Sequence, residues 1–298
     1  MNKLNYILTD NIKEKIYIMA IKITSDSTCD LGKITAERNI GVMPLKVNLD
    51  TETYLDGVNI TPQDIFEFVE KTKMLPKTSA PSVTDYEEFF AKELEGYDEL
   101  IHFSISSKSS VSHTVAKQAA ESFKGKVRVI DSMNLSSGQG LVVLKAADLR
   151  DEGKTADEIE AGVNAVRAKV NTSFIPDRLD YLYKGGRCSR MEMYGANLLK
   201  IHPMIDMVDG ALTVKKKYRG KMSIIIKQYV EELYSSYPTY DKTRCFVTHS
   251  TADREIVDLA IKMVKELFDF DVIEETVAGS VITGHCGRNT LGVLFIHD

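Results

Sequence analysis

Short apolar, β-branched runs alternate with longer stretches of helical period along the first half of the chain, and this alternation limits the fold most. Four runs have the length and composition of strands: residues 21–25, 42–49, 100–105 and 127–130. Helical stretches begin at Thr61 and Ser82 and cover residues 110–123 and 138–150. Because buried parallel strands need helical crossovers, the pattern predicts an α/β fold with a doubly wound, mainly parallel sheet.

The pattern changes after the polar segment at residues 151–154. An Asp-Gly turn at Asp209 and Gly210 separates two alternating runs, which is a hairpin signal. The other expected elements are helices at 155–169, 222–237 and 253–268 and strands at 245–249, 272–277 and 292–297. We therefore expect an N-terminal extension (1–19), an N-terminal α/β domain (20–154) and a C-terminal α+β domain with a mixed sheet (155–298).

The composition disfavours several classes of protein. The chain has 298 residues, 43% of them hydrophobic, and a formal net charge of −5 without a long basic run, so nucleic-acid binding is not expected. No segment approaches the roughly 18–20 uncharged apolar residues of a transmembrane helix. Residues 1–18 lack the apolar centre of a secretory signal. The four cysteines form no disulfide framework or CxxC pair, and a cytoplasmic location is expected.

The sequence contains no convincing nucleotide or metal site. Gly138 and Gly140 superficially resemble a dinucleotide fingerprint, but Val143 replaces its third glycine, and residues 132–137 separate the expected strand from Gly138. Neither a GxxxxGK[ST] nor a GxSxG motif occurs. The six histidines show no metal-ligand spacing. We therefore expect neither a cofactor nor a bound metal.

Hydroxyl-rich loops are the main candidates for a binding site. Segments 25–29, 104–112 and 132–137 follow expected strands, where ligands of parallel sheets bind. Ser82 and Ser110 are expected helix caps, and the remaining hydroxyls resemble a polar collar for a carboxylate or carbonyl. His285 lies between glycines, which allow a close backbone approach. The Lys184-Gly185-Gly186-Arg187 segment is either a helix C-cap or a bend that offers Arg187 to an anion.

Several segments, taken together and in order, resemble the DegV family of bacterial fatty-acid-binding proteins. They are residues 24–28 (TSDST), 77–82 (KTSAPS), 105–107 (ISS), 183–189 (YKGGRCS), 198–203 (LLKIHP) with 209–210 (DG), and 285–287 (HCG) with 291–292 (LG). The resemblance covers the chain from about residue 21 to its end. It implies a two-domain α/β protein with a ligand tunnel between the domains.

The resemblance also implies a function without catalysis by this chain. A DegV protein binds one long-chain fatty acid and presents its carboxylate to an ATP-dependent fatty acid kinase, and the acyl phosphate feeds phospholipid synthesis. By position, the residues expected to bind the carboxylate are Thr78, Ser79, Ser106, Ser107 and His285. Arg187 would contact the kinase or the phosphoryl group, and Asp26 and Ser27 would line the crevice floor. Donors must replace water at a buried carboxylate, whereas apolar lining suffices for the acyl chain.

Two alternatives stay open at this point. The Ser/Thr collar and His285 could instead hydrolyse or transfer acyl groups, or the protein could be a kinase-binding scaffold whose lipid is structural. The chain also departs from the family near Val111, where a Leu-Ser-Gly-Thr-Tyr-like helix start is usual. Arg288 and Asn289 replace the usual Pro-Gly-like pair. These departures bear on the choice of lipid or on the partner surface.

Overall fold

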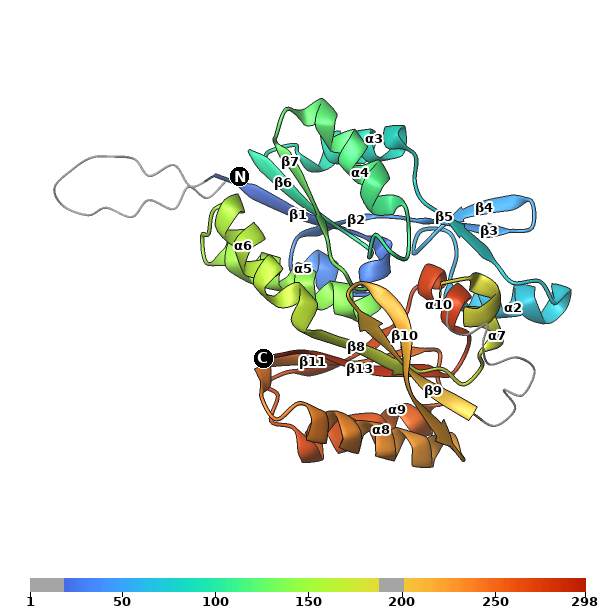
Figure 1. Cartoon of the computed structure of the whole chain (residues 1–298). Coiled ribbons are helices and arrows are strands. Elements are labelled where there is room, and N and C mark those ends of the chain that lie inside the picture. The colour runs from blue at the N-terminus through green and yellow to red at the C-terminus, as the bar shows by residue number, and fades with distance from the viewer. Residues whose placement is uncertain (1–18, 188–200) are drawn as a thin grey trace.

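The computed structural model describes residues 19–187 and 201–298, and places two main sheets on either side of one long helix (Figure 1). Most of the expected N-terminal extension, Cys188 and the expected motif positions 188–189 and 198–200 lie outside the described residues. No helix within the described ranges is both long and apolar enough to cross a membrane.

The first sheet is parallel, as predicted, and contains four strands in the order β2-β1-β6-β7. Its strands are β1 (Ile21–Asp26), β2 (Ile40–Met43), β6 (Glu99–Ser104) and β7 (Val127–Asp131). Short α1 (Ile34–Glu37) precedes β2, and α3 (Val83–Glu93) and α4 (Ser112–Ala120) pack on one face of the sheet. Ser82 caps α3 as expected, whereas α4 begins after Val111 and Ser110 is not its N-cap residue.

The expected strand at residues 42–49 is two strands in different sheets. β2 ends at Met43, and β3 (Lys46–Leu49) pairs antiparallel with β4 (Glu52–Leu55) and β5 (Lys77–Ser79) in a small sheet. Pro44 lies at the break and has no amide hydrogen for a strand ladder, which is the physical reason for the division. The helix α2 (Pro62–Thr72) connects β4 to β5 and begins with a Thr61 capping box.

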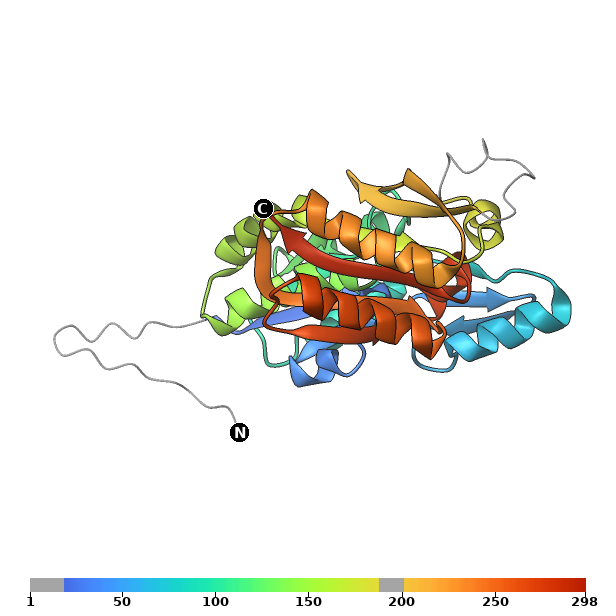
Figure 2. The same ribbon diagram turned by 90° about the horizontal axis from the view of Figure 1, so that it is seen from below.

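The second large sheet is mixed, as predicted, with the order β10-β9-β8-β13-β11-β12. Its strands are β8 (Val170–Ile175), β9 (Ile201–Val208), β10 (Ala211–Arg219), β11 (Tyr240–Ser250), β12 (Ile273–Val277) and β13 (Thr290–His297). β9 and β10 form the expected hairpin. The amphipathic helices α8 (Met222–Ser236) and α9 (Arg254–Leu267) lie side by side and cover one face of the sheet (Figure 2).

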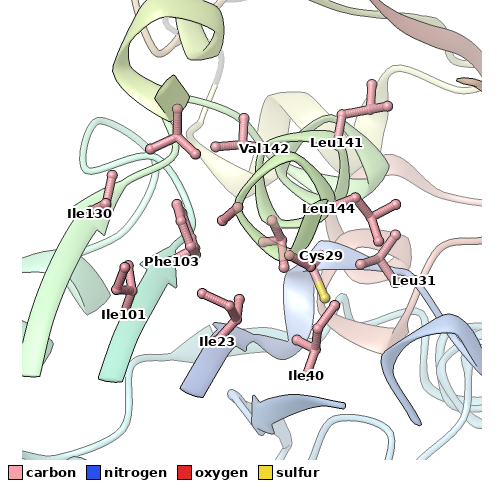
Figure 3. Close-up of a cluster of buried hydrophobic side chains, with 14 of the residues drawn as sticks. Ile23, Cys29, Leu31, Ile40, Ile101, Phe103, Ile130, Leu141, Val142 and Leu144 are labelled. Atoms are coloured by element: carbon pink, nitrogen blue, oxygen red, sulfur yellow. The ribbon is translucent and has the colours of Figure 1, made fainter. Parts of the chain in front are cut away.

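The helix between the two sheets, α5 (Ser136–Asp151), is buried nearly all round over its first half. Side chains from β1, β6 and β7 point toward it, and α6 (Ala156–Val166) packs beside it (Figure 3). A Cβ on Gly138 would collide with Thr172 of β8, and a Cβ on Gly140 would lie 2.7 Å from the Cys29 carbonyl oxygen. The glycines that superficially resemble a dinucleotide motif therefore permit close packing of α5 between the sheets.

Two short helices complete the fold near the small sheet. They are α7 (Asp180–Gly185) and α10 (Ser280–Cys286), and α10 packs against α2, α7, β3 and β5 (Figure 1). The apolar cluster beneath them draws on both halves of the chain, for example Val47 of β3, Ile205 of β9 and Ile282 of α10. Elements distant in sequence thus meet around α10.

Candidate functional site

Thr78 of β5 and His285 of α10 come together although 207 residues separate them along the chain. The Thr78 Oγ1 and the His285 Nε2 are 2.9 Å apart. Both residues are among those expected to bind a carboxylate. The pairing follows from the packing of α10 against β5.

The imidazole of His285 is kept neutral by its surroundings. Burial, followed by the positive charge of Arg187, lowers the pKa of His285 to about 4. Its Nδ1 is buried and has no hydrogen-bond partner among the described residues. Gly185 lies against this nitrogen, since a Cβ at position 185 would be 2.7 Å from Nδ1. The ring therefore presents an unsatisfied polar atom beside the Gly-Gly segment.

Arg187 lies on the exposed side of the same segment. Gly186 adopts a φ of 68° and caps α7, and the Arg187 Nη1 donates a hydrogen bond to the Gly185 carbonyl oxygen at 2.6 Å. The segment is thus a helix C-cap, the first of the two alternatives considered for it. The second is compatible with it, because Arg187 is exposed and its charge acts on His285.

Ser106 and Ser107 follow β6 but form their hydrogen bonds elsewhere. The buried Ser106 hydroxyl donates to the Gly210 carbonyl oxygen at 2.6 Å, in the turn of the β9–β10 hairpin. The Ser107 amide donates to the Asp131 carboxylate at 3.2 Å, and Ser107 is exposed. Within the described ranges, their hydrogen bonds connect to the hairpin and to β7, whereas Thr78 is bonded to His285. Contact of Ser106 or Ser107 with a ligand stays a prediction.

The remaining predicted residues also have protein partners. The exposed Ser79 hydroxyl accepts a hydrogen bond from the Asn48 side chain at 3.2 Å. The Asp26 carboxyl is fully buried, and its partners are the Tyr86 hydroxyl at 2.7 Å, the Ile105 amide at 2.9 Å and the His102 Nε2 at 3.2 Å. Asp26 therefore fixes the loop after β6 against the end of β1.

Ser27 connects β1 to the small sheet. Its hydroxyl donates to the Asp56 carboxylate at 2.8 Å and accepts from the Leu45 amide at 3.2 Å. Asp56 in turn accepts from the Ser280 amide at 2.7 Å, at the start of α10. Ser27 thus helps to position the start of α10 through Asp56, and contact of Asp26 or Ser27 with a ligand stays a prediction.

A small internal cavity lies beside α10, between the start of α5 and the mixed sheet. Its volume is about 30 Å³, and Ile282 and Cys286 of α10 line it together with Phe174 and Leu294. α10 therefore carries both the cavity wall and His285. Binding pockets for small molecules usually have about 300–1,000 Å³, so a long ligand would enter only as the lining side chains or elements move apart.

The cavity surface is mainly apolar although several lining residues are Ser or Thr. Their hydroxyl groups are bonded to the protein. Ser250 donates to the Gly287 carbonyl oxygen at 2.6 Å, and Thr290 donates to the Cys286 carbonyl oxygen at 2.9 Å. Such residues offer carbon to the cavity and keep their polar atoms satisfied. An alkyl chain is the chemistry that this lining suits.

Sequence reasoning missed Asp30 and Asp56, two buried acids at the start of α10. Their side chains accept hydrogen bonds from the Gly279 and Ser280 amides. Asp56 precedes Gly57, and this pair indicates only a turn. Nothing in the neighbouring sequence shows that α10, which is distant along the chain, packs over Asp56. The cavity-lining residues of β8, β11 and β13 were missed because they are ordinary strand residues.

The chain matches a known protein family over nearly its whole length. The sequence profile of the family described as "Uncharacterised protein, DegV family" matches residues 20–298. This chain belongs to the DegV family. A DegV domain-containing protein of Clostridium acetobutylicum is 33% identical over 282 residues, which cover 93% of this chain and 98% of that protein. The family resemblance noted in the sequence is therefore confirmed.

Solved structures of DegV proteins share the fold. A DegV family protein from Thermus thermophilus, described as fatty acid binding, superposes with a TM-score of 0.87 at 26% identity and covers 94% of this chain and 100% of its own. A stearic-acid-binding protein from Eubacterium ventriosum gives a TM-score of 0.80 at 27% identity and covers 93% and 98%. The α/β fold class predicted from the sequence is confirmed, and these DegV neighbours bind fatty acids.

Proposed function

We propose that this protein binds one long-chain fatty acid without covalent chemistry and presents its carboxylate to a separate ATP-dependent kinase. The carboxylate would lie at Thr78 and His285, and the acyl chain would extend into the cavity beside α10. The neighbours described as fatty acid binding support the ligand class. The kinase partner rests on the family resemblance and on Arg187.

The observation that carries the proposal is His285, whose Nε2 is bonded to the Thr78 hydroxyl while its buried Nδ1, next to Gly185, has no partner among the described residues. Buried polar groups without partners are rare in folded proteins and call for a ligand or water. The Thr78–His285 hydrogen bond uses one of the two hydrogens of the pair, which leaves one donor for a ligand: the Nδ1–H when Thr78 donates to Nε2, or the Thr78 hydroxyl when Nε2 donates to it. A carboxylate needs such donors when it leaves water, since its desolvation costs several kcal/mol.

The acyl chain would be held by apolar contact alone. Each buried CH₂ group contributes about 0.8 kcal/mol, so a long chain gains enough to open a cavity that is closed to about 30 Å³. The apolar lining from Phe174, Ile282 and Leu294 supplies the contacts. Chain length and unsaturation would follow from the shape of the opened cavity.

Arg187 is suited to the transfer step. Its guanidinium is exposed, close enough to lower the pKa of His285, and tethered by one hydrogen bond to the Gly185 carbonyl oxygen. A guanidinium can form paired hydrogen bonds with a phosphoryl group or with a carboxylate on a partner. Because the sequence contains no P-loop motif, the partner kinase would bring the ATP.

The acyl hydrolase alternative would use a hydroxyl nucleophile and His285 as its base. In catalytic triads a third group orients the base through its second nitrogen. No side chain in the described part of the molecule forms a hydrogen bond with the His285 Nδ1. The geometry therefore favours binding over nucleophilic catalysis.

Native mass spectrometry of the purified protein, followed by extraction of its ligand, tests the binding function. A stoichiometric long-chain fatty acid is the expected result. A protein that is empty and takes up no fatty acid from a mixture would refute it. Addition of kinase and ATP to the loaded protein should then form an acyl phosphate, trapped as a hydroxamate, and Arg187→Ala should reduce its rate while leaving fatty acid affinity nearly unchanged.

A further inference from the structure

Two buried carboxyl groups hold the first turn of α10. The Asp30 Oδ1 accepts a hydrogen bond from the Gly279 amide at 2.9 Å, and the Asp56 Oδ1 accepts one from the Ser280 amide at 2.7 Å. Asp30 is 6% exposed and Asp56 is 4% exposed. Asp30 follows β1 and Asp56 follows β4. Two loops from the first half of the chain therefore hold α10, a helix close to the C-terminus.

The two carboxyl groups, called the carboxyl pair below, face the same point in space. A Cβ on Gly279 would lie 3.1 Å from an oxygen of Asp30 and 3.1 Å from an oxygen of Asp56. Any side chain at this position would enter the gap between the carboxyl groups. Glycine at position 279 is therefore what allows both acids to approach the backbone of α10.

The other partners of the carboxyl pair are hydroxyl groups. Ser136 of α5 donates to the Asp30 Oδ2 at 2.5 Å, and Ser27 donates to the Asp56 Oδ2 at 2.8 Å. The charge of Asp56 acts on Asp30, and the charge of Asp30 acts on the buried thiols of Cys29 and Cys286. Among the described residues, no cation pairs with either carboxyl group.

Protonation is the remaining way to reduce this charge. Burial raises the pKa of Asp30 to about 8, and the charge of Asp56 adds to the effect, while hydrogen bonds from Ser136 and Gly279 oppose it. Burial also raises the pKa of Asp56. The thiols do not compete, since burial raises the pKa of both Cys29 and Cys286 to about 12.

Movement at the start of α10 would reach the proposed carboxylate site. The helix has only two turns, so His285 lies one turn and a half beyond Ser280, and Ile282 and Cys286 of the cavity wall lie on the same helix. Displacing the Gly279 and Ser280 amides would change the distance between His285 and Thr78, which is now set at 2.9 Å between Nε2 and Oγ1.

We propose that Asp30 and Asp56 are positioning residues that together carry one proton and thereby hold the start of α10, so that loss of this proton releases the helix and weakens ligand binding. The effect on binding rests on the proposed fatty acid function, whereas the effect on α10 does not. Full ionisation leaves two buried carboxylates, and the cost of their burial favours an opened state in which water reaches them. The amide hydrogen bonds from Gly279 and Ser280 oppose this opening, and the charge of Asp56 on Asp30 adds to it.

Hydrogen exchange tests the fastening of α10 without any lipid. Protection factors of residues 280–286, corrected for the intrinsic pH effect on exchange, are compared with those of α9 between about pH 7 and about pH 9. With wild-type protein we expect the α10 protection to fall about tenfold over this range, as one ionisation with a midpoint near pH 8 requires. In Asp30→Asn, an isostere of the protonated acid, we expect the protection to be constant.

Asp271→Asn, at an exposed acid before β12, is the matched control and should behave as wild type. Equal pH dependence of α10 in wild type and Asp30→Asn would overturn the proposal. If Asp30→Asn does not fold, Asp56→Asn is measured instead. Asp30 stays ionisable in that variant, and we expect the midpoint of the α10 transition to move to lower pH, because the charge of Asp56 contributes to the raised pKa of Asp30. An unchanged midpoint would overturn the proposal.

Fatty acid affinity over the same pH range tests the link to the ligand site. Between about pH 7 and about pH 9 we expect the dissociation constant of the wild type to rise about tenfold more than that of Asp30→Asn. The ionisation of the fatty acid is common to both proteins and cancels in this comparison. Absence of fatty acid binding at pH 7 would refute the proposed function, and hydrogen exchange would still decide the role of the carboxyl pair. Binding with a profile identical in both proteins would refute the link.

Discussion

His285 combines three properties that rarely occur together in one side chain. It is neutral because burial lowers its pKa to about 4, its Nε2 is bonded to Thr78, and its buried Nδ1 has no partner among the described residues. A structural histidine would have both nitrogens satisfied, as His102 has through Thr24 and Asp26. The contrast between the two histidines is the residue-level reason for placing the ligand at His285.

Removing either member of the Thr78–His285 pair should weaken fatty acid binding. We expect Thr78→Val and His285→Gln each to raise the dissociation constant about 10- to 100-fold, because a hydrogen bond to a charged group contributes about 1.5–3 kcal/mol. Isothermal titration of delipidated protein measures the effect. Thr243→Val, at an exposed threonine on β11, is the control and should bind as wild type. Unchanged affinity in both site variants would place the carboxylate elsewhere.

The ionisation of His285 should report the ligand directly. In delipidated protein the ring should titrate near pH 4, and a bound carboxylate should raise this pKa because a nearby negative charge favours the imidazolium. The unfolded chain has the higher, ordinary histidine pKa. This residue's contribution to folding stability is therefore present above about pH 6.5 and is lost as pH falls toward about 4. NMR titration of the ring with and without fatty acid measures the shift, and an identical pKa in both forms would contradict direct contact.

At the scale of elements, two neighbouring glycines at the end of α7 should have different roles, Gly185 in ligand binding and Gly186 in folding stability. A Cβ on Gly185 would lie 2.7 Å from the His285 Nδ1, whereas a Cβ on Gly186 would meet no atom within 4 Å but would have to adopt a φ of 68°. Gly185→Ala should therefore displace the imidazole and reduce fatty acid affinity several-fold. Gly186→Ala should lower the free energy of unfolding by about 1 kcal/mol and leave affinity unchanged. Calorimetry and ligand titration of the two variants distinguish these outcomes, and equal affinities would count against the site.

The sequence predicted helix starts and the hairpin turn correctly, because these features depend on residues close together in the chain. The Thr61 and Ser82 caps and the Asp209–Gly210 hairpin turn occur as expected because each depends on neighbours within a few residues. The prediction of one strand over residues 42–49 was wrong, because the chain changes sheets at Pro44. The apolar pattern continues across this position and does not reveal the break, whereas the missing amide hydrogen of proline accounts for it.

The assembly of the site could not be read from local patterns. The family resemblance assigned Thr78 and His285 to the carboxylate, and the flanking glycines had already marked His285 as a candidate. The sequence alone could not show that the two side chains touch, because the contact depends on how α10 packs against β5. The same applies to Gly138 and Gly140. Their spacing resembles a phosphate-binding turn, and only the position of α5 between two sheets shows that they serve packing.

At the scale of the whole molecule, the β9–β10 hairpin and the loop after β6 connect the two sheets. Ser106 donates to the Gly210 carbonyl oxygen at 2.6 Å, and Gly210 leaves no room for a side chain, because a Cβ would lie 2.8 Å from the Ser106 Oγ. Ser106→Ala should lower the free energy of unfolding by about 0.5–1.5 kcal/mol and increase hydrogen exchange in residues 208–211. If affinity for fatty acid falls tenfold while exchange is unchanged, Ser106 acts on the ligand instead of on the hairpin.

Under the proposed function, ligand length is a property of the whole molecule, because an acyl chain entering a cavity of about 30 Å³ would have to separate α10 from the mixed sheet. Ala278 lines the cavity and is 3% exposed, so Ala278→Leu adds bulk on the path of the chain without touching Thr78 or His285. We expect this variant to lose affinity progressively with chain length, by a factor set by the roughly 0.8 kcal/mol of each CH₂ that no longer fits. Competition among saturated acids of increasing length measures this loss, with Ala91→Leu on the exposed face of α3 as the control. An equal loss of affinity for short and long acids would contradict this prediction. It would show that the substitution acts on the carboxylate site and not on the space for the acyl chain.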